Sequence, residues 1–157
     1  MKNKHVIVAM LVAPLLAILA WFAVGQFAGE KPHAALPGQS YPLVEQSNCR
    51  YDSGACDVEN EDVRFRLTLV QSGSALELHL SSSLPLEGVL LAVTVAGMGN
   101  KPAGMATVDA DGKLWRLALA ELPRKDGRLR IAARSAGSNY YADVATSFLD
   151  RYRQENP

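Results

Sequence analysis

Apolar and polar side chains alternate with a period of two along much of the chain beyond residue 62. In "VRFRLTLVQ", one face carries Val63, Phe65, Leu67 and Leu69, and the other carries Arg64, Arg66 and Thr68. This alternation is typical of a strand with one buried face. Similar strand patterns are found in "SGSALELHLSSS", "DGRLRIAAR" and "NYYADVATSF", with apolar faces that include Leu76, Leu78, Leu80, Leu129, Ile131 and Ala133.

Two further stretches complete the series of predicted strands. "GVLLAVTVA" is apolar at nearly every position, which predicts a central strand buried on both faces. "MATVDADGKLWRLAL" predicts two strands joined by a "DADG" turn, with Trp115 in the core. About seven short strands at regular spacing predict an all-β domain, an immunoglobulin-like antiparallel sandwich. A small barrel is the alternative.

A different pattern occupies the N-terminus, where no charged residue occurs from Val6 to Ala28. A helix needs about 20 apolar residues to cross a bilayer, so this stretch predicts a transmembrane anchor. Lys2 and Lys4 precede it, which predicts a cytoplasmic N-terminus and a periplasmic C-terminal domain in a bacterial inner membrane. The alternatives are a signal peptide cleaved near Ala23 and a buried core helix.

The chain therefore divides into four predicted segments. Residues 1–28 form the single-pass anchor, 29–47 a proline-rich tether, 48–150 the sandwich and 151–157 a tail. In the alternative for the tether, part of it folds onto the domain, with Tyr41 and Leu43 beginning a first strand. The tail has lost the alternation and predicts a short helical turn or a frayed end.

The only two cysteines, Cys49 and Cys56, lie seven positions apart in "NCRYDSGAC". In an oxidising compartment such a pair is expected to form a disulfide. A hairpin about Asp52 and Ser53, with Gly54 at positive φ, would place the two cysteines opposite each other. Zinc needs about four ligands and thiol redox enzymes use C-x-x-C, so neither alternative fits the pattern.

Catalytic patterns are absent from the sequence. There is no G-x-S-x-G, and His79 lies on the polar face of its strand near Glu77. The acidic run at residues 59–62 lacks the glycine and spacing of a calcium loop. Sixteen basic residues balance 16 acidic ones, which does not favour nucleic acid. We expect neither enzymatic activity nor a small-molecule substrate.

One predicted hairpin is rich in arginine. Arg128, Arg130 and Arg134 lie on its polar face, and they are candidate contacts for an acidic protein partner or for anionic lipid. Such a row can instead prevent an exposed sheet from pairing with another sheet.

Methionines flank the glycine-rich stretch "GMGNKPAGM". Thioethers are soft ligands that bind Cu(I), so Met98 and Met105 are candidate copper ligands, with His79 as a third. Packing is the alternative role for methionine. No other cofactor is expected.

"DGKLWRLAL" followed by "GRLRIAAR", after a membrane anchor and tether, resembles the FixH-like and YtkA-like families of membrane-tethered sandwich domains. The resemblance covers mainly residues 63–135 and includes the spacing of Gly112 and Trp115. It implies a non-catalytic role, in assembly or copper loading of a respiratory oxidase, although a clear set of copper ligands is missing. The expected function is therefore a periplasmic accessory protein that binds an envelope or respiratory partner, with Cu(I) handling as the alternative.

Overall fold

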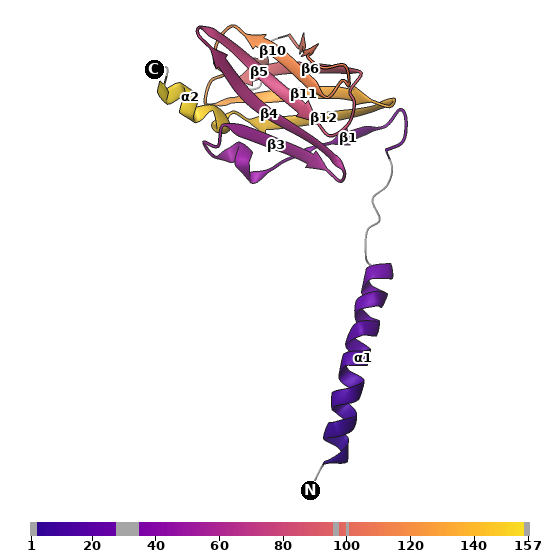
Figure 1. Ribbon diagram of the computed structural model, residues 1–157. Helices are drawn as coiled ribbons and strands as arrows, with labels where there is room; N and C mark the ends of the chain where they lie inside the picture. Colours follow the sequence, from indigo (N-terminus) through magenta and orange to yellow (C-terminus); the bar gives the residue numbers. More distant parts are fainter. Residues whose placement is uncertain (1–2, 28–34, 96–97, 100, 156–157) are drawn as a thin grey trace. The chain divides into compact units, whose positions relative to one another are not determined.

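The computed structural model describes residues 3–27, 35–95, 98–99 and 101–155. The chain divides into two compact units, Met1–Ala34 and Ala35–Pro157. The first unit contains one helix, and the second contains all the strands (Figure 1).

The N-terminal unit is the helix α1 (Lys4–Phe27). Its stretch Lys4–Val24 has a mean hydropathy of 2.7 and none of it is buried, so it is long and apolar enough to cross a membrane. Pro14 lies inside the helix, which continues past it. The end of the predicted anchor, Ala28, lies outside the described residues.

The second unit is built from two sheets, as the all-β prediction requires, rather than from one closed barrel (Figure 1). Sheet 1 has the order β1-β12-β11-β6-β7, with β8 also paired to β6. Its strands are β1 (Ser40–Pro42), β6 (Gly88–Val95), β7 (Met98–Gly99), β8 (Ala103–Gly104), β11 (Gly127–Ser135) and β12 (Ser138–Ala145). Neighbouring strands are antiparallel except β1 and β12, which are parallel.

Sheet 2 has the order β2-β3-β4-β5-β10-β9, and all of its pairs are antiparallel. Its strands are β2 (Val44–Glu45), β3 (Ala55–Asn60), β4 (Val63–Ser72), β5 (Ala75–Ser82), β9 (Ala106–Thr107) and β10 (Leu114–Leu119). The "DADG" turn joins β9 and β10, which pair as the sequence predicts.

Strands with strict alternation fold as predicted, with their apolar faces inside. β11 alternates buried and exposed residues along its whole length, and β4 does so over its first half. Phe65 of β4 and Tyr140 of β12 meet edge to face across the two sheets, with ring centroids 6.3 Å apart. Burial raises the pKa of the Tyr140 hydroxyl, and nearby Tyr41 raises it further. Trp115 packs in the core, as predicted, and its Nε1 donates to the Gly112 carbonyl at 2.9 Å.

The prediction that β6 is buried on both faces is wrong. Val89 and Leu91 are 3% and 2% exposed, whereas Leu90 between them is 50% exposed. Sheet 2 lies against the inner face of β6, and Leu90 points from the outer face, on which the described residues place no further sheet. The apolar run therefore includes a surface position.

The stretch "GMGNKPAGM", predicted as a loop, contributes two short strands to sheet 1. β7 and β8 both pair with β6, and the chain then crosses to sheet 2 as β9. Met105 lies at the crossing and is only 6% exposed. Its side chain is part of the core between the sheets.

The compact domain begins earlier than predicted. It starts at Ala35 rather than at residue 48, because β1 pairs with β12 and β2 pairs with β3. The alternative for the tether therefore holds for residues 40–45, where Leu43 is buried. Residues 29–34 lie outside the described residues.

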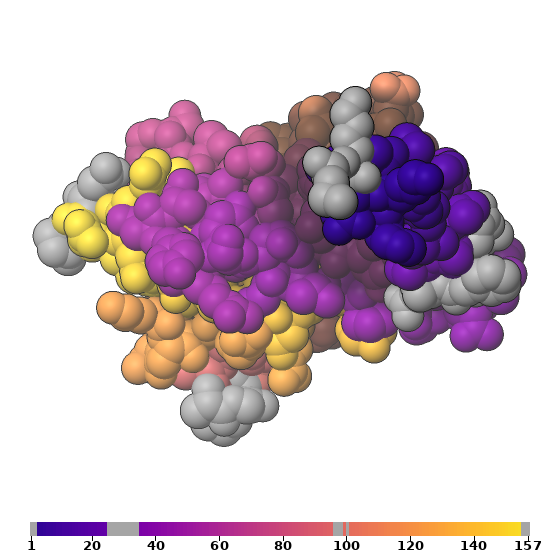
Figure 2. All heavy atoms as spheres, turned by 90° about the horizontal axis from the view of Figure 1, so that it is seen from below, coloured from indigo at the N-terminus to yellow at the C-terminus, as the bar shows by residue number. Residues whose placement is uncertain are grey.

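The C-terminal residues pack against the domain as helical turns. A 3-10 turn (Ser147–Leu149) buries Phe148 and leads into α2 (Asp150–Glu155). The Tyr152 hydroxyl donates to the Leu69 carbonyl at 2.9 Å, and the backbone N–H of Arg151 donates to the Asp52 carboxylate at 2.6 Å. In Figure 2 this C-terminal segment (yellow) lies beside the purple segment that carries the cysteines.

The turn before β10 provides a test of the fold. Gly112 has φ +65, and an added Cβ would lie 2.9 Å from the Leu86 carbonyl oxygen. We expect Gly112→Ala to lower the free energy of unfolding by about 2–3 kcal/mol, of which a left-handed φ accounts for about 1–2 kcal/mol. Urea unfolding of the full chain in detergent, followed by circular dichroism, measures this difference.

Gly73→Ala is the matched control. Gly73 has φ +61, but nothing lies within 4 Å of its added Cβ. We expect a loss of about 1–2 kcal/mol, from the backbone conformation alone. Equal losses in the two variants would show that the contact with Leu86 has no effect on stability.

Candidate functional site

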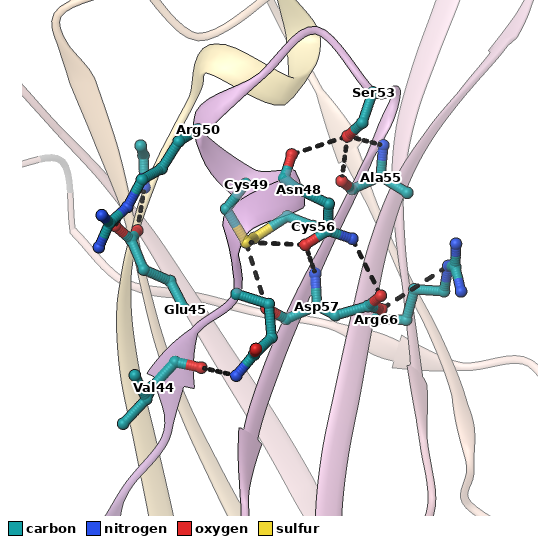
Figure 3. The surroundings of a disulfide bond; sticks show 12 residues. Val44, Glu45, Asn48, Cys49, Arg50, Ser53, Ala55, Cys56, Asp57 and Arg66 are labelled. Atoms are coloured by element: carbon teal, nitrogen blue, oxygen red, sulfur yellow. Dashed lines mark hydrogen bonds and ion pairs between the residues drawn. A yellow bond between two sulfur atoms is a disulfide. The ribbon is translucent and has the colours of Figure 1, made fainter.

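The two cysteines form a disulfide, with 2.06 Å between the sulfurs (Figure 3). The predicted hairpin around them is wrong. Cys56 lies on β3 opposite Leu67, whereas Cys49 lies in a 3-10 helix (Ser47–Arg50). One edge of β3 pairs with β4 and the other pairs with β2. Cys49 follows the end of β2, in the connection that leads to β3, and does not lie on a strand. Gly54 does have a positive φ, of +73, as predicted.

Polar groups around the disulfide join the 3-10 helix to β3 (Figure 3). Asn48 Nδ2 donates to the Asp57 carboxylate at 2.9 Å, and the Asp57 N–H donates to Asn48 Oδ1 at 3.1 Å. The guanidinium of Arg66 lies 3.7 Å from the same carboxylate. These contacts hold the two cysteine-bearing segments in one position.

Both cysteines have no exposed surface. Thiol–disulfide exchange requires that an attacking thiolate reach one of the sulfurs. Their burial in the core therefore favours a structural role over redox catalysis.

The three predicted contact arginines lie on the outer face of sheet 1, and each has a carboxylate partner. Arg128 and Arg130 both bind Asp143, the latter at 3.3 Å, and Arg128 also lies 3.7 Å from Glu45. The Arg134 guanidinium lies 3.2 Å from the Glu87 carboxylate. Since these arginines are largely neutralised within the domain, charge alone does not define a binding surface here.

Apolar side chains lie between the arginines on the same outer face. Leu90, Ala132 and Tyr141 are directly opposed on β6, β11 and β12 and form an apolar row across sheet 1. Leu90 and Tyr141 are 50% and 49% exposed. Beside the row, a hollow of about 270 Å³ is lined by Leu90, Ala132, Arg130, Thr94, Gly99 and Pro102, among others.

His79 is separated from Met105, one of the two methionines of the predicted copper site. Its ring Nε2 lies 3.0 Å from a Glu77 carboxylate oxygen, and Arg116 lies 3.4 Å from the other oxygen. His79 points from the outer face of sheet 2, because its neighbours Leu78 and Leu80 are fully buried.

Met105 lies in the core between the sheets, so sheet 2 separates it from His79. Met98 begins β7, but its side chain lies outside the described residues. The structure therefore does not bring Met105 and His79 together. Among the described residues, no group of three or more His, Cys, Asp or Glu side chains is placed to hold a metal.

Sequence reasoning missed Leu90 and Tyr141 as surface residues. Leu90 stood in an apolar run, and Tyr141 is one of two adjacent tyrosines of which only Tyr140 is buried. The row forms only through the strand register, which places Ala132 opposite Leu90, 42 positions earlier in the chain, and opposite Tyr141, nine positions later. Alternation in "NYYADVATSF" was the one available signal for Tyr141.

Comparisons of this chain with protein-family models, with curated proteins and with solved structures gave no match. We therefore infer its function from its own residues and surfaces.

Proposed function

We propose that this chain is a non-enzymatic accessory protein of a bacterial inner membrane, whose periplasmic domain binds a partner protein. The helix α1 supports membrane attachment, and the lysines before it support a cytoplasmic N-terminus. The resemblance to FixH-like and YtkA-like domains suggests a respiratory oxidase as the partner and its assembly as the process.

Strand order supports an immunoglobulin-like sandwich as the finer description of the domain. In constant-type immunoglobulin domains one sheet has the order ABED and the other contains C, F and G. The order β4-β5-β10-β9 in sheet 2 corresponds to ABED, and β6, β11 and β12 in sheet 1 correspond to C, F and G. Domains with this architecture often act by binding, through exposed sheet faces or loops.

The observation that carries the partner-binding proposal is the apolar row Leu90–Ala132–Tyr141 on the outer face of sheet 1, where Leu90 and Tyr141 are about half exposed. Protein interfaces are enriched in tyrosine and arginine around an apolar centre. Arg130 and Arg134 lie on either side of the row, and the hollow beside it has room for a partner's side chain. Because the arginines already have carboxylate partners, we assign the binding energy mainly to the row.

Complementation of a deletion strain tests this proposal. We expect membranes without the protein to lose oxidase activity, and the wild-type chain to restore it. Leu90→Glu places a charge in the row, and loss of a central contact worth about 2 kcal/mol weakens binding about 30-fold. This variant should therefore fail to restore activity although it accumulates in membranes.

Val70→Glu is the matched control, because Val70 is 41% exposed on β4 of the other sheet. We expect it to complement fully. Full activity with Leu90→Glu would exclude the row as the binding surface, and full activity in the deletion strain would exclude the role in oxidase assembly.

Retention of the helix is a further prediction. The apolar stretch exceeds the usual length of about 7–15 residues for a signal peptide's apolar region, so we expect no cleavage. The protein should fractionate with membranes, and its intact mass should include residues 1–28. A soluble species that begins near Gln26 would contradict the prediction.

A further inference from the structure

An apolar cleft opens between the two sheets at one side of the domain. Its volume is about 570 Å³, which lies within the range of about 300–1,000 Å³ typical of ligand sites. Leu91, Val93 and Val95 line it from β6, and Leu117 and Leu119 line it from β10. Among the described residues, no side chain fills this part of the space between the sheets.

The cleft exists because one strand closes only part of this side. Residues 103–107 cross from β6 to β10, and Met105 fills the space between the sheets there. β9 pairs with β10 only at Trp115 and Arg116. Among the described residues, no strand pairs with the same edge of β10 from Leu117 to Leu119.

The free edge of β10 offers backbone hydrogen-bonding groups beside the cleft. The Val108 N–H donates to the Leu114 carbonyl, so the backbone groups of Leu114 point toward β9. The Lys113 carbonyl accepts from the Ser82 N–H, so the backbone groups of Lys113 point toward β5 on the opposite side. Since these directions alternate along a strand, Ala118 must point its N–H and carbonyl toward the free edge. Ala118 also lines the cleft.

The rim of the cleft has little net charge and small side chains. Lys101, Glu121 and Arg124 line it, and the Arg124 guanidinium lies 3.3 Å from Asp126. Opposite charges at the rim thus nearly balance, so the rim does not favour a charged ligand of either sign. Ala118, like Ala103 and Ala120 nearby, leaves room for another backbone to approach.

We propose that this cleft binds an extended apolar segment of a polypeptide, which adds to β10 as a new edge strand. Its backbone pairs with Ala118, and alternate apolar side chains enter the space between Val93, Leu117 and Leu119. A hydrocarbon chain would fill the apolar space but would leave the hydrogen-bonding groups of Ala118 unused, so the edge favours a peptide. As a binding mode for a protein partner, this inference rests on the proposed function.

A synthetic peptide provides the test, titrated by calorimetry into the full chain in lipid nanodiscs, with empty nanodiscs as the blank. The probe is a capped heptapeptide of alternating threonine and valine. The Ala118 side chain lies on the outer face of sheet 2, because its neighbours Leu117 and Leu119 point into the cleft. The peptide residue that pairs with Ala118 also points its side chain outward. The threonine N–H groups therefore face β10 when the valine side chains enter the cleft. We expect saturable binding with a Kd below about 1 mM.

Two modified peptides separate strand pairing from apolar insertion. Methylation of the threonine backbone nitrogens removes the donors that face β10, and we expect it to weaken binding at least about tenfold. The valine N–H groups point away from β10, so methylation of the valine nitrogens should leave the affinity unchanged.

Matched protein variants test the same contact from the other side. Ala118→Pro removes the edge N–H without breaking a bond to β5, since proline is tolerated at an edge whose N–H faces solvent. We expect it to weaken peptide binding at least about tenfold, whereas Ala118→Thr, which keeps the N–H, should not.

Absence of saturable binding by 1 mM peptide overturns the inference. Equal affinity for the unmodified peptide and both methylated peptides also overturns it, as does equal affinity of Ala118→Pro and Ala118→Thr for the unmodified peptide. Either result would show that the cleft binds apolar groups without strand pairing. These outcomes are independent of the complementation by Leu90→Glu, so failure of the cleft and failure of the outer-face proposal are distinguishable.

Discussion

Replacement of Phe65 by alanine is expected to lower the free energy of unfolding by about 3–5 kcal/mol. Phe65 has no exposed surface and lies at the centre of the core, where it contacts Tyr140 of the opposite sheet. Its removal leaves a cavity that closely packed neighbours cannot fill, and it also removes an aromatic pair worth about 0.5–1.5 kcal/mol.

Urea unfolding of the full chain measures the loss. Val70→Ala is the matched control, because Val70 lies on the same strand but points to solvent and should cost less than about 1 kcal/mol. Near-equal losses in the two variants would contradict the assignment of Phe65 to a core shared by both sheets.

Replacement of both cysteines by alanine is expected to cost about 2–5 kcal/mol. A seven-residue separation gives a small loop, for which chain entropy alone predicts about 2–3 kcal/mol. The structure adds a second reason, because both residues are fully buried in the core and their loss also removes packing. We therefore expect the upper part of the range.

Unfolding of the oxidised protein, of the reduced protein and of the double alanine variant separates the two contributions. Reduction breaks only the cross-link, so the free energy of unfolding of the reduced protein should lie between those of the oxidised protein and the double alanine variant. Loss of partner-dependent activity in a variant that remains folded would instead indicate chemistry at Cys49 or Cys56.

Local alternation predicted β4, β5, β11 and β12, because in each strand the apolar residues at every second position identify the buried face. Leu129 and Ile131, for example, point inward at every second position, as the sequence indicates. These assignments need no knowledge of the partner strand.

Features that depend on distant pairing were not predictable. The burial of Leu90 depends on whether a layer covers the outer face of sheet 1, and the position of Met105 depends on where the chain crosses between sheets. The disulfide followed from compartment and spacing, but the 3-10 position of Cys49 depends on β2 pairing with β3. The row and the cleft are likewise products of register.

Site-specific photocrosslinking in intact cells tests the partner-binding claim most directly. With a photoreactive benzoylphenylalanine in place of Tyr141, we predict one discrete adduct with a protein partner. The adduct should be lost when Leu90→Glu is added, and the same group in place of Val70, on the exposed face of sheet 2, should not form it. The same adducts from both positions, or none from position 141, would contradict the claim that the outer face of sheet 1 binds a partner.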